Sequence, residues 1–206
     1  MTPGQFARRL LGRHFESVGK VYRRFFVDLD KVVAIFAREL PHGARILDIG
    51  GGDGALIDRL LDRRPDLDIS LCDLAPSIGE FLSDTNRAQV KILPATPFDS
   101  VSGTFDAVTL SDVIHHIPVT QRDDFFRSLA DACSAWHCRK LVLKDIEPGA
   151  IRSGLSVLAD RYITGDRHVV LFSRTDFAQM AAKYFPTAKR TSEMADWPNY
   201  CETLSW

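Results

Sequence analysis

The sequence predicts an α/β fold, with one doubly wound, mainly parallel sheet and a helical cap at the N-terminus. Short apolar runs rich in strand-forming residues alternate with segments of helical periodicity over residues 44–146. The first apolar run continues into a run of glycines and then into a helix-like segment. With 206 residues, 45% of them hydrophobic, the chain is long enough for one well-packed domain and short for two.

The N-terminal segment is expected to be helical over residues 5–40, ending at Pro41-His42-Gly43, because proline and glycine often terminate helices. We therefore predict a helical cap over residues 1–40 and the sheet-containing domain over residues 41–206. In that domain we expect strands at 44–50, 68–74, 90–93, 105–111 and 140–146, helices at 55–64, 122–136, 149–163 and 175–185, and a closing strand pair at 188–194 and 199–206.

Charge and hydropathy exclude several classes of function. The formal net charge of -1 and the isoelectric point near 6.6 provide no general field for binding nucleic acid. Residues 1–45 are locally basic, and they either face an acidic substrate or a membrane surface or form a solvated helix face. The longest strongly apolar run, Val32–Ala37, is far shorter than the about 20 residues that span a bilayer. No signal-peptide core is present, so we expect a cytoplasmic protein without an integral membrane segment.

The four cysteines predict neither disulfides nor a metal centre. They form no CxxC pair, and a chain of this size needs no disulfide to be stable. Cys133, His137 and Cys138 are close in sequence, but no second cluster of ligands accompanies them. We therefore expect reduced thiols and no metal.

The most informative segment is Asp48-Ile49-Gly50-Gly51-Gly52-Asp53-Gly54. Glycine has no Cβ and tolerates positive φ, so a glycine turn between a strand and a helix lets the backbone approach a ligand closely. In an open parallel sheet, ligands bind outside the carboxyl ends of the strands. Asp73 ends the next strand, where a carboxylate can accept hydrogen bonds from both hydroxyls of a ribose. Alone, the turn can be only a turn, and either aspartate can be a helix N-cap or a surface charge; their joint order favours a ligand site.

Two ligands suit this order of residues. Gly50-x-Gly52-x-x-Ala55 formally matches the dinucleotide fingerprint, and the acid on the second strand matches it as well. A negative charge at Asp48 would repel a pyrophosphate, whereas it suits the cationic ammonium group of S-adenosylmethionine. Electrostatics therefore favours the methyl donor over NAD.

The segment ILDIGGGDG resembles the glycine loop of class I S-adenosylmethionine-dependent methyltransferases, and FDAVTLSDVIHHIP is similar to the same family's fourth strand and following loop. The resemblance implies a Rossmann-like methyltransferase fold of the small-molecule type. It implies that Asp48 and Gly50 lie by the methionine part of the donor and Gly52 by its sugar. It also places Ser111 near the methionine end, with Asp112 beside it.

The same resemblance implies that Asp73 binds the ribose and that Leu74 packs on the adenine. The family often has an acid just after the third strand, facing the adenine amino group, but this chain has Pro94-Ala95-Thr96-Pro97-Phe98 there. Thr96 or a backbone carbonyl is expected to take that role.

Methyl transfer needs alignment of donor and acceptor first, and a base only if the acceptor is a hydroxyl that must lose its proton. His115, His116 and His168 are the candidate bases, because imidazole titrates near neutral pH. His116 is the first choice, since it precedes Ile117-Pro118, where the loop turns. Each histidine can instead serve only to hydrogen-bond within its loop.

The predicted function is therefore methyl transfer to a small-molecule acceptor, most simply a hydroxyl of a natural-product or lipid-like compound. A non-catalytic donor-binding homologue, or a partner subunit, is one alternative. A nucleic-acid methyltransferase is another, but the chain has no Asn/Asp-Pro-Pro-aromatic segment and no Pro-Cys nucleophile. A nicotinamide-dependent reductase of the short-chain type would need Tyr-x-x-x-Lys, which the sequence lacks. We expect no nucleic-acid partner, and both a monomer and a homodimer are compatible with the sequence.

Overall fold

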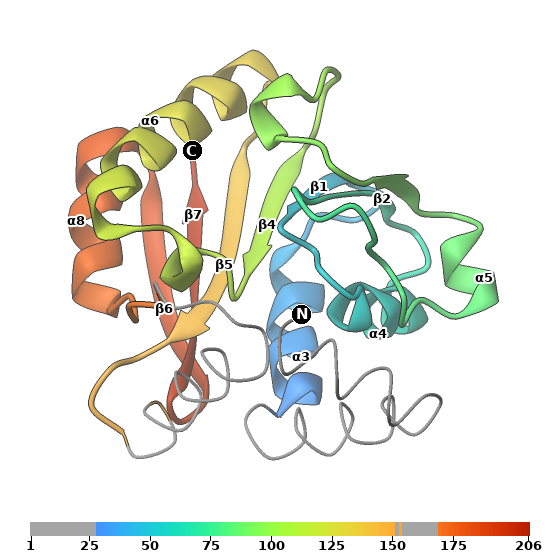
Figure 1. The fold of residues 1–206 in the computed structure, drawn as a ribbon, viewed down its shortest axis with the longest axis horizontal. Coiled ribbons are helices and arrows are strands. Elements are labelled where there is room, and N and C mark those ends of the chain that lie inside the picture. The colour runs from blue at the N-terminus through green and yellow to red at the C-terminus, as the bar shows by residue number, and fades with distance from the viewer. Residues whose placement is uncertain (1–27, 151–152, 154–168) are drawn as a thin grey trace.

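The computed structural model describes residues 28–150, 153 and 169–206, and it is organised around a seven-stranded sheet (Figure 1). The strand order is β3-β2-β1-β4-β5-β7-β6; the first five strands are parallel, and β7 is antiparallel to both of its neighbours. The strands are β1 Arg45–Ile49, β2 Asp68–Cys72, β3 Lys91–Leu93, β4 Ala107–Ser111, β5 Lys140–Ile146, β6 Lys189–Asp196 and β7 Asn199–Ser205.

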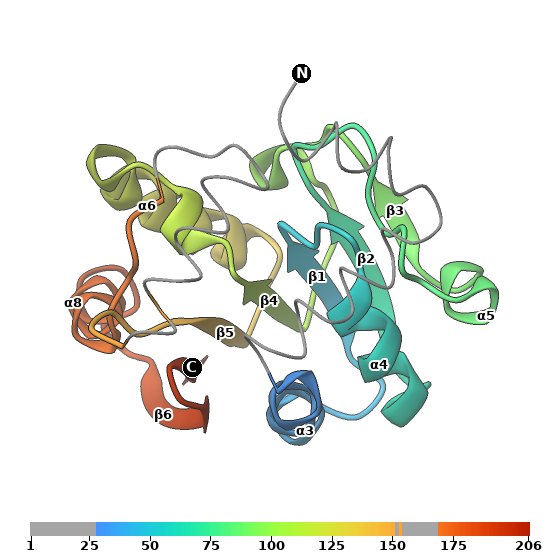
Figure 2. The ribbon, with the colours of Figure 1, turned by 60° about the horizontal axis from the view of Figure 1, so that its bottom comes forward.

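Helices cover both faces of the sheet, as the turned view in Figure 2 shows: α3 and α4 lie on one face and α6 on the other. Phe126 of α6 and Phe177 of α8 have ring centroids 6.1 Å apart, so these two helices pack together on the same face. The helices are α3 Leu29–Glu39, α4 Ala55–Arg63, the short α5 Asp84–Arg87, α6 Val119–Ala135 and α8 Arg174–Tyr184, with 3-10 turns η1 Phe98–Ser100 and η2 Ile114–His116.

Strand alternation builds two cores, one on each face. In β1, Leu47 and Ile49 belong to the core under α6 and α8, whereas Ile46 belongs to the core under α3 and α4. This is the expected consequence of side chains alternating across a strand when both faces of a parallel sheet are covered. The strands are consequently almost wholly buried, and the site must lie at their ends.

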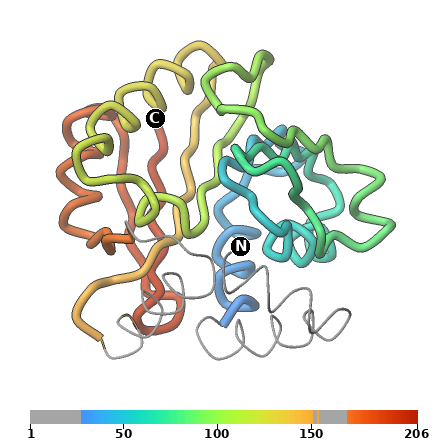
Figure 3. Tube along the Cα trace, viewed as in Figure 1, coloured from blue at the N-terminus to red at the C-terminus, as the bar shows by residue number. Residues whose placement is uncertain are grey.

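The sheet reverses its order at β1, which pairs with β2 on one side and with β4 on the other. Chain connections leave this point in opposite directions, so the loops after β1 and β4 diverge and open a crevice. Figure 3 shows the other end of the sheet, where the C-terminal strand pair runs alongside β5. The crevice is therefore bordered by the glycine loop after β1 and by the turn η2 after β4.

The predicted doubly wound fold is confirmed, including all five parallel strands and the closing hairpin. Helix α6 begins at Val119, three residues earlier than its periodicity predicted, and α5 and the two 3-10 turns were not predicted. Helix α3 packs its buried face, including Val33 and Phe36, on the core that it shares with α4. The cap prediction for residues 1–40 otherwise lies mostly outside the described residues, as does the helix at 149–163. None of the described helices is long and apolar enough to cross a membrane.

Candidate active site

The glycine loop packs directly on the sheet beneath it. Gly50 has φ 71°, and a Cβ built there would come within 2.6 Å of a Val113 methyl group. At Gly51 a Cβ would lie 2.6 Å from the Asp48 carboxylate and 2.1 Å from Leu71. The loop therefore needs glycine at both positions, and it brings bare backbone to the carboxyl end of β1.

Asp73 holds the loop from the end of β2. One carboxylate oxygen accepts a hydrogen bond from the Gly52 N–H at 3.0 Å, and the other accepts one from the Ala75 N–H at 2.8 Å. Asp73 also lines a cavity at this end of the sheet, so the remaining lone pairs of its carboxylate oxygens can accept hydrogen bonds from a ligand. Asp73 thus has the position and the chemistry to bind hydroxyl groups.

Asp48 lies beneath the glycine loop and does not form part of the cavity wall. Its side chain is 2% exposed and accepts a hydrogen bond from the Thr109 hydroxyl at 2.5 Å. The pKa of Asp48 is raised to about 7, chiefly by burial and also by the nearby charge of Asp73, while the bond from Thr109 opposes the shift. The expectation of a permanently charged Asp48 facing the ligand therefore needs correction, because near neutral pH this carboxyl exchanges between its acid and its anion.

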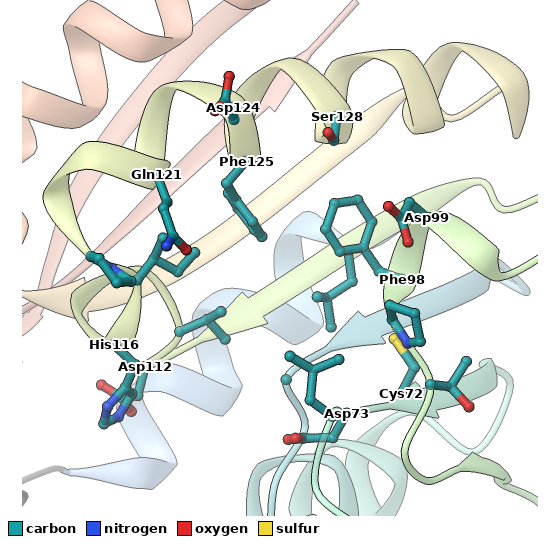
Figure 4. Close-up of a pocket in the computed structure, with 18 residues that line it drawn as sticks. Cys72, Asp73, Phe98, Asp99, Asp112, His116, Gln121, Asp124, Phe125 and Ser128 are labelled. Atoms are coloured by element: carbon teal, nitrogen blue, oxygen red, sulfur yellow. The ribbon is translucent and has the colours of Figure 1, made fainter. Parts of the chain in front are cut away.

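A cavity of about 720 Å³ opens at the switch point of the sheet. This volume is in the range of small-molecule sites. Figure 4 shows Cys72 and Asp73 at the end of β2 on one side and Gln121, Phe125 and Ser128 of α6 on the other. Phe98 from η1 meets Phe125 edge to face, with ring centroids 5.3 Å apart.

The cavity wall carries carboxylates: Asp73, Asp99, Asp112 and Asp124 line it, and no Lys or Arg does among the described residues. Two of these charges are balanced. Both oxygens of Asp112 lie 2.6–2.7 Å from Nζ of the fully buried Lys144, and Asp124 accepts a hydrogen bond from Arg127 at 2.7 Å. In Figure 4 the Asp124 carboxylate points away from the cavity. The acidic character of the wall therefore comes mainly from Asp73 and Asp99.

The two adjacent histidines of η2 have different environments. His116 lines the cavity next to Asp112 (Figure 4). His115 is 2% exposed, and its Nδ1 lies 2.6 Å from a carboxylate oxygen of the buried Asp145 on β5. The two imidazole rings are in contact, with centroids 4.3 Å apart. The structure thus assigns one histidine to the cavity and the other to the core behind it.

Asp112, His115 and Asp145 have ligand atoms within 4.8 Å of one another and could in principle hold a metal ion. The ammonium group of Lys144 already lies between the oxygens of Asp112, so a cation would have to displace it. We interpret the three side chains as a hydrogen-bonded support for η2.

The other predicted residues divide between the cavity and its surroundings. Leu74, 74% exposed, and Thr96 line the cavity, but the Thr96 hydroxyl donates to the Pro94 carbonyl at 2.9 Å. Ser111 does not line it, and its hydroxyl lies 3.4 Å from Asp112. His168 lies outside the described residues.

Sequence reasoning missed the contribution of α6. Gln121, Asp124, Phe125 and Ser128 line the cavity at spacings of three and four, which place them on one face of a helix. That periodicity was readable, but a polar and aromatic helix face carries no sign of which ligand it meets. Asp99 was missed because it follows β3 only after an irregular segment.

The chain is similar to known methyltransferases in sequence and in fold. Residues 47–135 match a family model described as a methyltransferase domain. The chain is also 30% identical, over 98 residues, to the malonyl-[acyl-carrier protein] O-methyltransferase of Geobacter sulfurreducens. That match covers 46% of this chain and 37% of that enzyme. Residues 47–135 therefore resemble a methyltransferase domain.

Solved structures of methyltransferases share the fold of this chain. Human N-acetylserotonin methyltransferase, solved in complex with S-adenosylmethionine, has a TM-score of 0.68 at 13% identity, covering 97% of this chain and 57% of that one. An O-methyltransferase family 2 protein from Planctomyces limnophilus, solved in complex with apigenin, also has a TM-score of 0.68, at 15% identity. The match covers 95% of this chain and 62% of that protein. The chain thus spans about three fifths of these two structures.

Proposed function

We propose that this protein transfers a methyl group from S-adenosylmethionine to a hydroxyl group of a small, uncharged aromatic molecule. The observation that carries the proposal is the glycine loop, held by Asp73 at the switch point of the sheet, opening onto a cavity that also contains His116. Bound S-adenosylmethionine supplies a methyl group on a positively charged sulfur, which needs no further activation.

The residues along the β1–β2–β3 side fit the donor. Asp73 offers acceptor oxygens for the ribose hydroxyls, and the exposed Leu74 beside it offers an apolar surface for the adenine. Asp99 on η1 supplies an acid after β3, six residues beyond the end of that strand. We assign the contact with the adenine amino group to Asp99 in place of Thr96, because a carboxylate is the stronger acceptor for that donor.

The wall composition favours an acceptor that is aromatic and uncharged. The cavity has apolar surface from Phe98, Ile117 and Phe125. The carboxylates of Asp73 and Asp99 on its wall would repel a negatively charged acceptor. A donor with a positive charge suits this field. Apigenin, the ligand solved with the Planctomyces limnophilus protein, is an example of a phenolic compound held by this fold.

In this proposal His116 is the general base. It lies on the cavity wall beside Asp112, whereas His115 has its Nδ1 engaged by Asp145. His115 then acts as a positioning residue, because its contact with the His116 ring fixes the orientation of η2. Removal of the acceptor proton by a positioned base contributes about 10²–10⁴ in rate.

The test is a screen of phenols, hydroxyquinones and small carboxylic acids with the full chain and S-adenosylmethionine, followed by histidine variants on any acceptor found. We expect methylated phenols, and we expect His116→Gln to lower kcat by about 10²–10⁴ with the affinity for S-adenosylhomocysteine unchanged. Methylation of carboxylic acids alone would contradict the acceptor class. Full activity of His116→Gln would withdraw the base assignment.

Donor binding separates this function from its rivals. Calorimetry should show micromolar binding of S-adenosylhomocysteine and none of NAD. A nicotinamide-dependent enzyme would give the reverse result. Donor binding without methylation of any acceptor in the screen would favour the non-catalytic homologue.

A further inference from the structure

A second cavity, of about 340 Å³, lies at the opposite end of α6 from the site described above. Its wall includes Cys133, His137, Cys138, Arg139 and Trp206. Cys133 is in the last turn of α6 and Cys138 lies two residues before the start of β5, so both lie at the amino end of that strand. Neither cysteine takes part in the proposed methyl transfer.

The end of α6 brings these two cysteines together through its backbone. The Cys138 N–H donates to the Cys133 carbonyl at 2.8 Å, and the His137 N–H donates to the Ser134 carbonyl at 3.1 Å. His137 has φ 60°. These three features define a Schellman motif, in which the side chains at the positions of Cys133 and Cys138 contact each other. Here that usually hydrophobic contact is made by two thiols.

The interaction between the two thiols distinguishes them chemically. The Cys133 side chain lowers the pKa of Cys138, although burial opposes this shift, and the Cys138 thiol donates to the Lys140 carbonyl at 3.1 Å. The same interaction, together with burial, raises the pKa of Cys133. Both residues are almost fully buried, but the cavity gives a small neutral molecule a route to their sulfur atoms.

We propose that Cys133 and Cys138 are a redox-active pair that forms a reversible disulfide when a small peroxide enters the second cavity. The Cys138 thiolate attacks one peroxide oxygen, the O–O bond breaks, and a sulfenic acid and hydroxide result; the hydroxide takes up the proton that the Cys138 thiol had released and becomes water. The Cys133 sulfur then attacks Cys138 Sγ, the S–S bond forms, the S–O bond breaks, and the hydroxide takes the Cys133 proton as water. In sum, two thiols are oxidised to a disulfide and one hydrogen peroxide is reduced to two molecules of water.

The sequence makes the test direct, because both cysteines lie in one tryptic peptide, residues 128–139, between Arg127 and the cleavage site after Arg139. The full chain is treated with hydrogen peroxide, alkylated and digested. We expect peptide 128–139 to lose two hydrogen atoms and to escape alkylation, and we expect dithiothreitol to restore both. Methionine sulfoxide in the same digest shows that peroxide reached the protein.

Variants assign the order of the steps. Cys133→Ser should leave a sulfenic acid at Cys138 that dimedone traps, whereas Cys138→Ser should leave Cys133 unlabelled at the same dose. Cys201→Ser, at another buried cysteine, is the matched control and should still form the disulfide. Complete alkylation of peptide 128–139 after peroxide treatment overturns the proposal. Conversion of Cys138 to sulfinic acid with no disulfide overturns it as well.

Discussion

Replacing Asp48 by asparagine should change folding stability and donor binding in opposite directions. The carboxyl group is buried beneath the glycine loop beside Thr109, where burial raises its pKa from 3.8 to about 7. Asparagine has nearly the same shape, keeps an oxygen that can accept the Thr109 hydrogen bond, and cannot ionise. The variant therefore removes the charge while retaining the packing.

The direction in which pH changes the folding stability follows from proton linkage. Because the folded state holds the Asp48 proton more tightly than the unfolded state, its contribution to stability is complete below pH 3.8 and is lost as the pH rises through about 7. A shift of about three pKa units corresponds to about 4 kcal/mol at most, at about 1.4 kcal/mol per unit. Asp48→Asn should lose none of this stability, so its advantage over the wild type should grow between pH 4 and 7 and then level off.

Urea denaturation of both proteins over this pH range measures the difference directly, since other titrating groups are common to the two. A difference in unfolding free energy that stays constant from pH 4 to pH 8 would refute the raised pKa. In the same variant, S-adenosylhomocysteine should bind more weakly above pH 7, because the ionised Asp48 favours the ligand's ammonium group. Wild-type binding near pH 7 should release protons, which appears as a dependence of the calorimetric enthalpy on the buffer, and the variant should release fewer.

Further predictions concern the cavity wall. Asp73→Ala should weaken S-adenosylhomocysteine binding by about 2–4 kcal/mol, because charge-assisted hydrogen bonds are lost; a loss under about 0.5 kcal/mol would mean that this carboxylate only braces the loop. Asp99→Ala should lower the same affinity by about 1.5–3 kcal/mol, whereas Asp124→Ala, on the same wall but aimed away, should not; equal effects would refute the assignment to the adenine. Asp112→Asn should destabilise the fold by about 2–3 kcal/mol in denaturation, since Lys144 loses its counter-charge, and a second change of Lys144→Met should recover most of it. An additive double variant would contradict that coupling.

The sheet could be predicted from the sequence because its strands are short, apolar and separated by helices of clear periodicity. The order of the glycine loop, Asp73 and the segment after β4 also predicted residues that line the cavity. These signals are local, so they need no knowledge of what packs against them.

The remainder of the site depends on contacts between distant segments. Nothing in the sequence shows that His115 is buried against Asp145 or that Lys144 neutralises Asp112, because both pairs join β5 to the loop after β4. The pKa of Asp48 likewise results from its depth beneath the loop, and its sequence position suggested an ordinary anion. Asp99 was obscured by an irregular segment that has no periodic pattern.

The outermost strand of the sheet, β6, has consequences for behaviour in concentrated solution. An edge strand exposes a row of backbone hydrogen-bonding groups, which another chain can use to extend the sheet into an aggregate. The first five residues of β6 are exposed, and three of them, Lys189, Arg190 and Glu193, are charged. Adding a further strand there would strip water from these charges, so the edge repels uncontrolled pairing. Replacing them with valine or isoleucine would favour fibrous association of a folded chain whose cavity at the switch point of the sheet is intact.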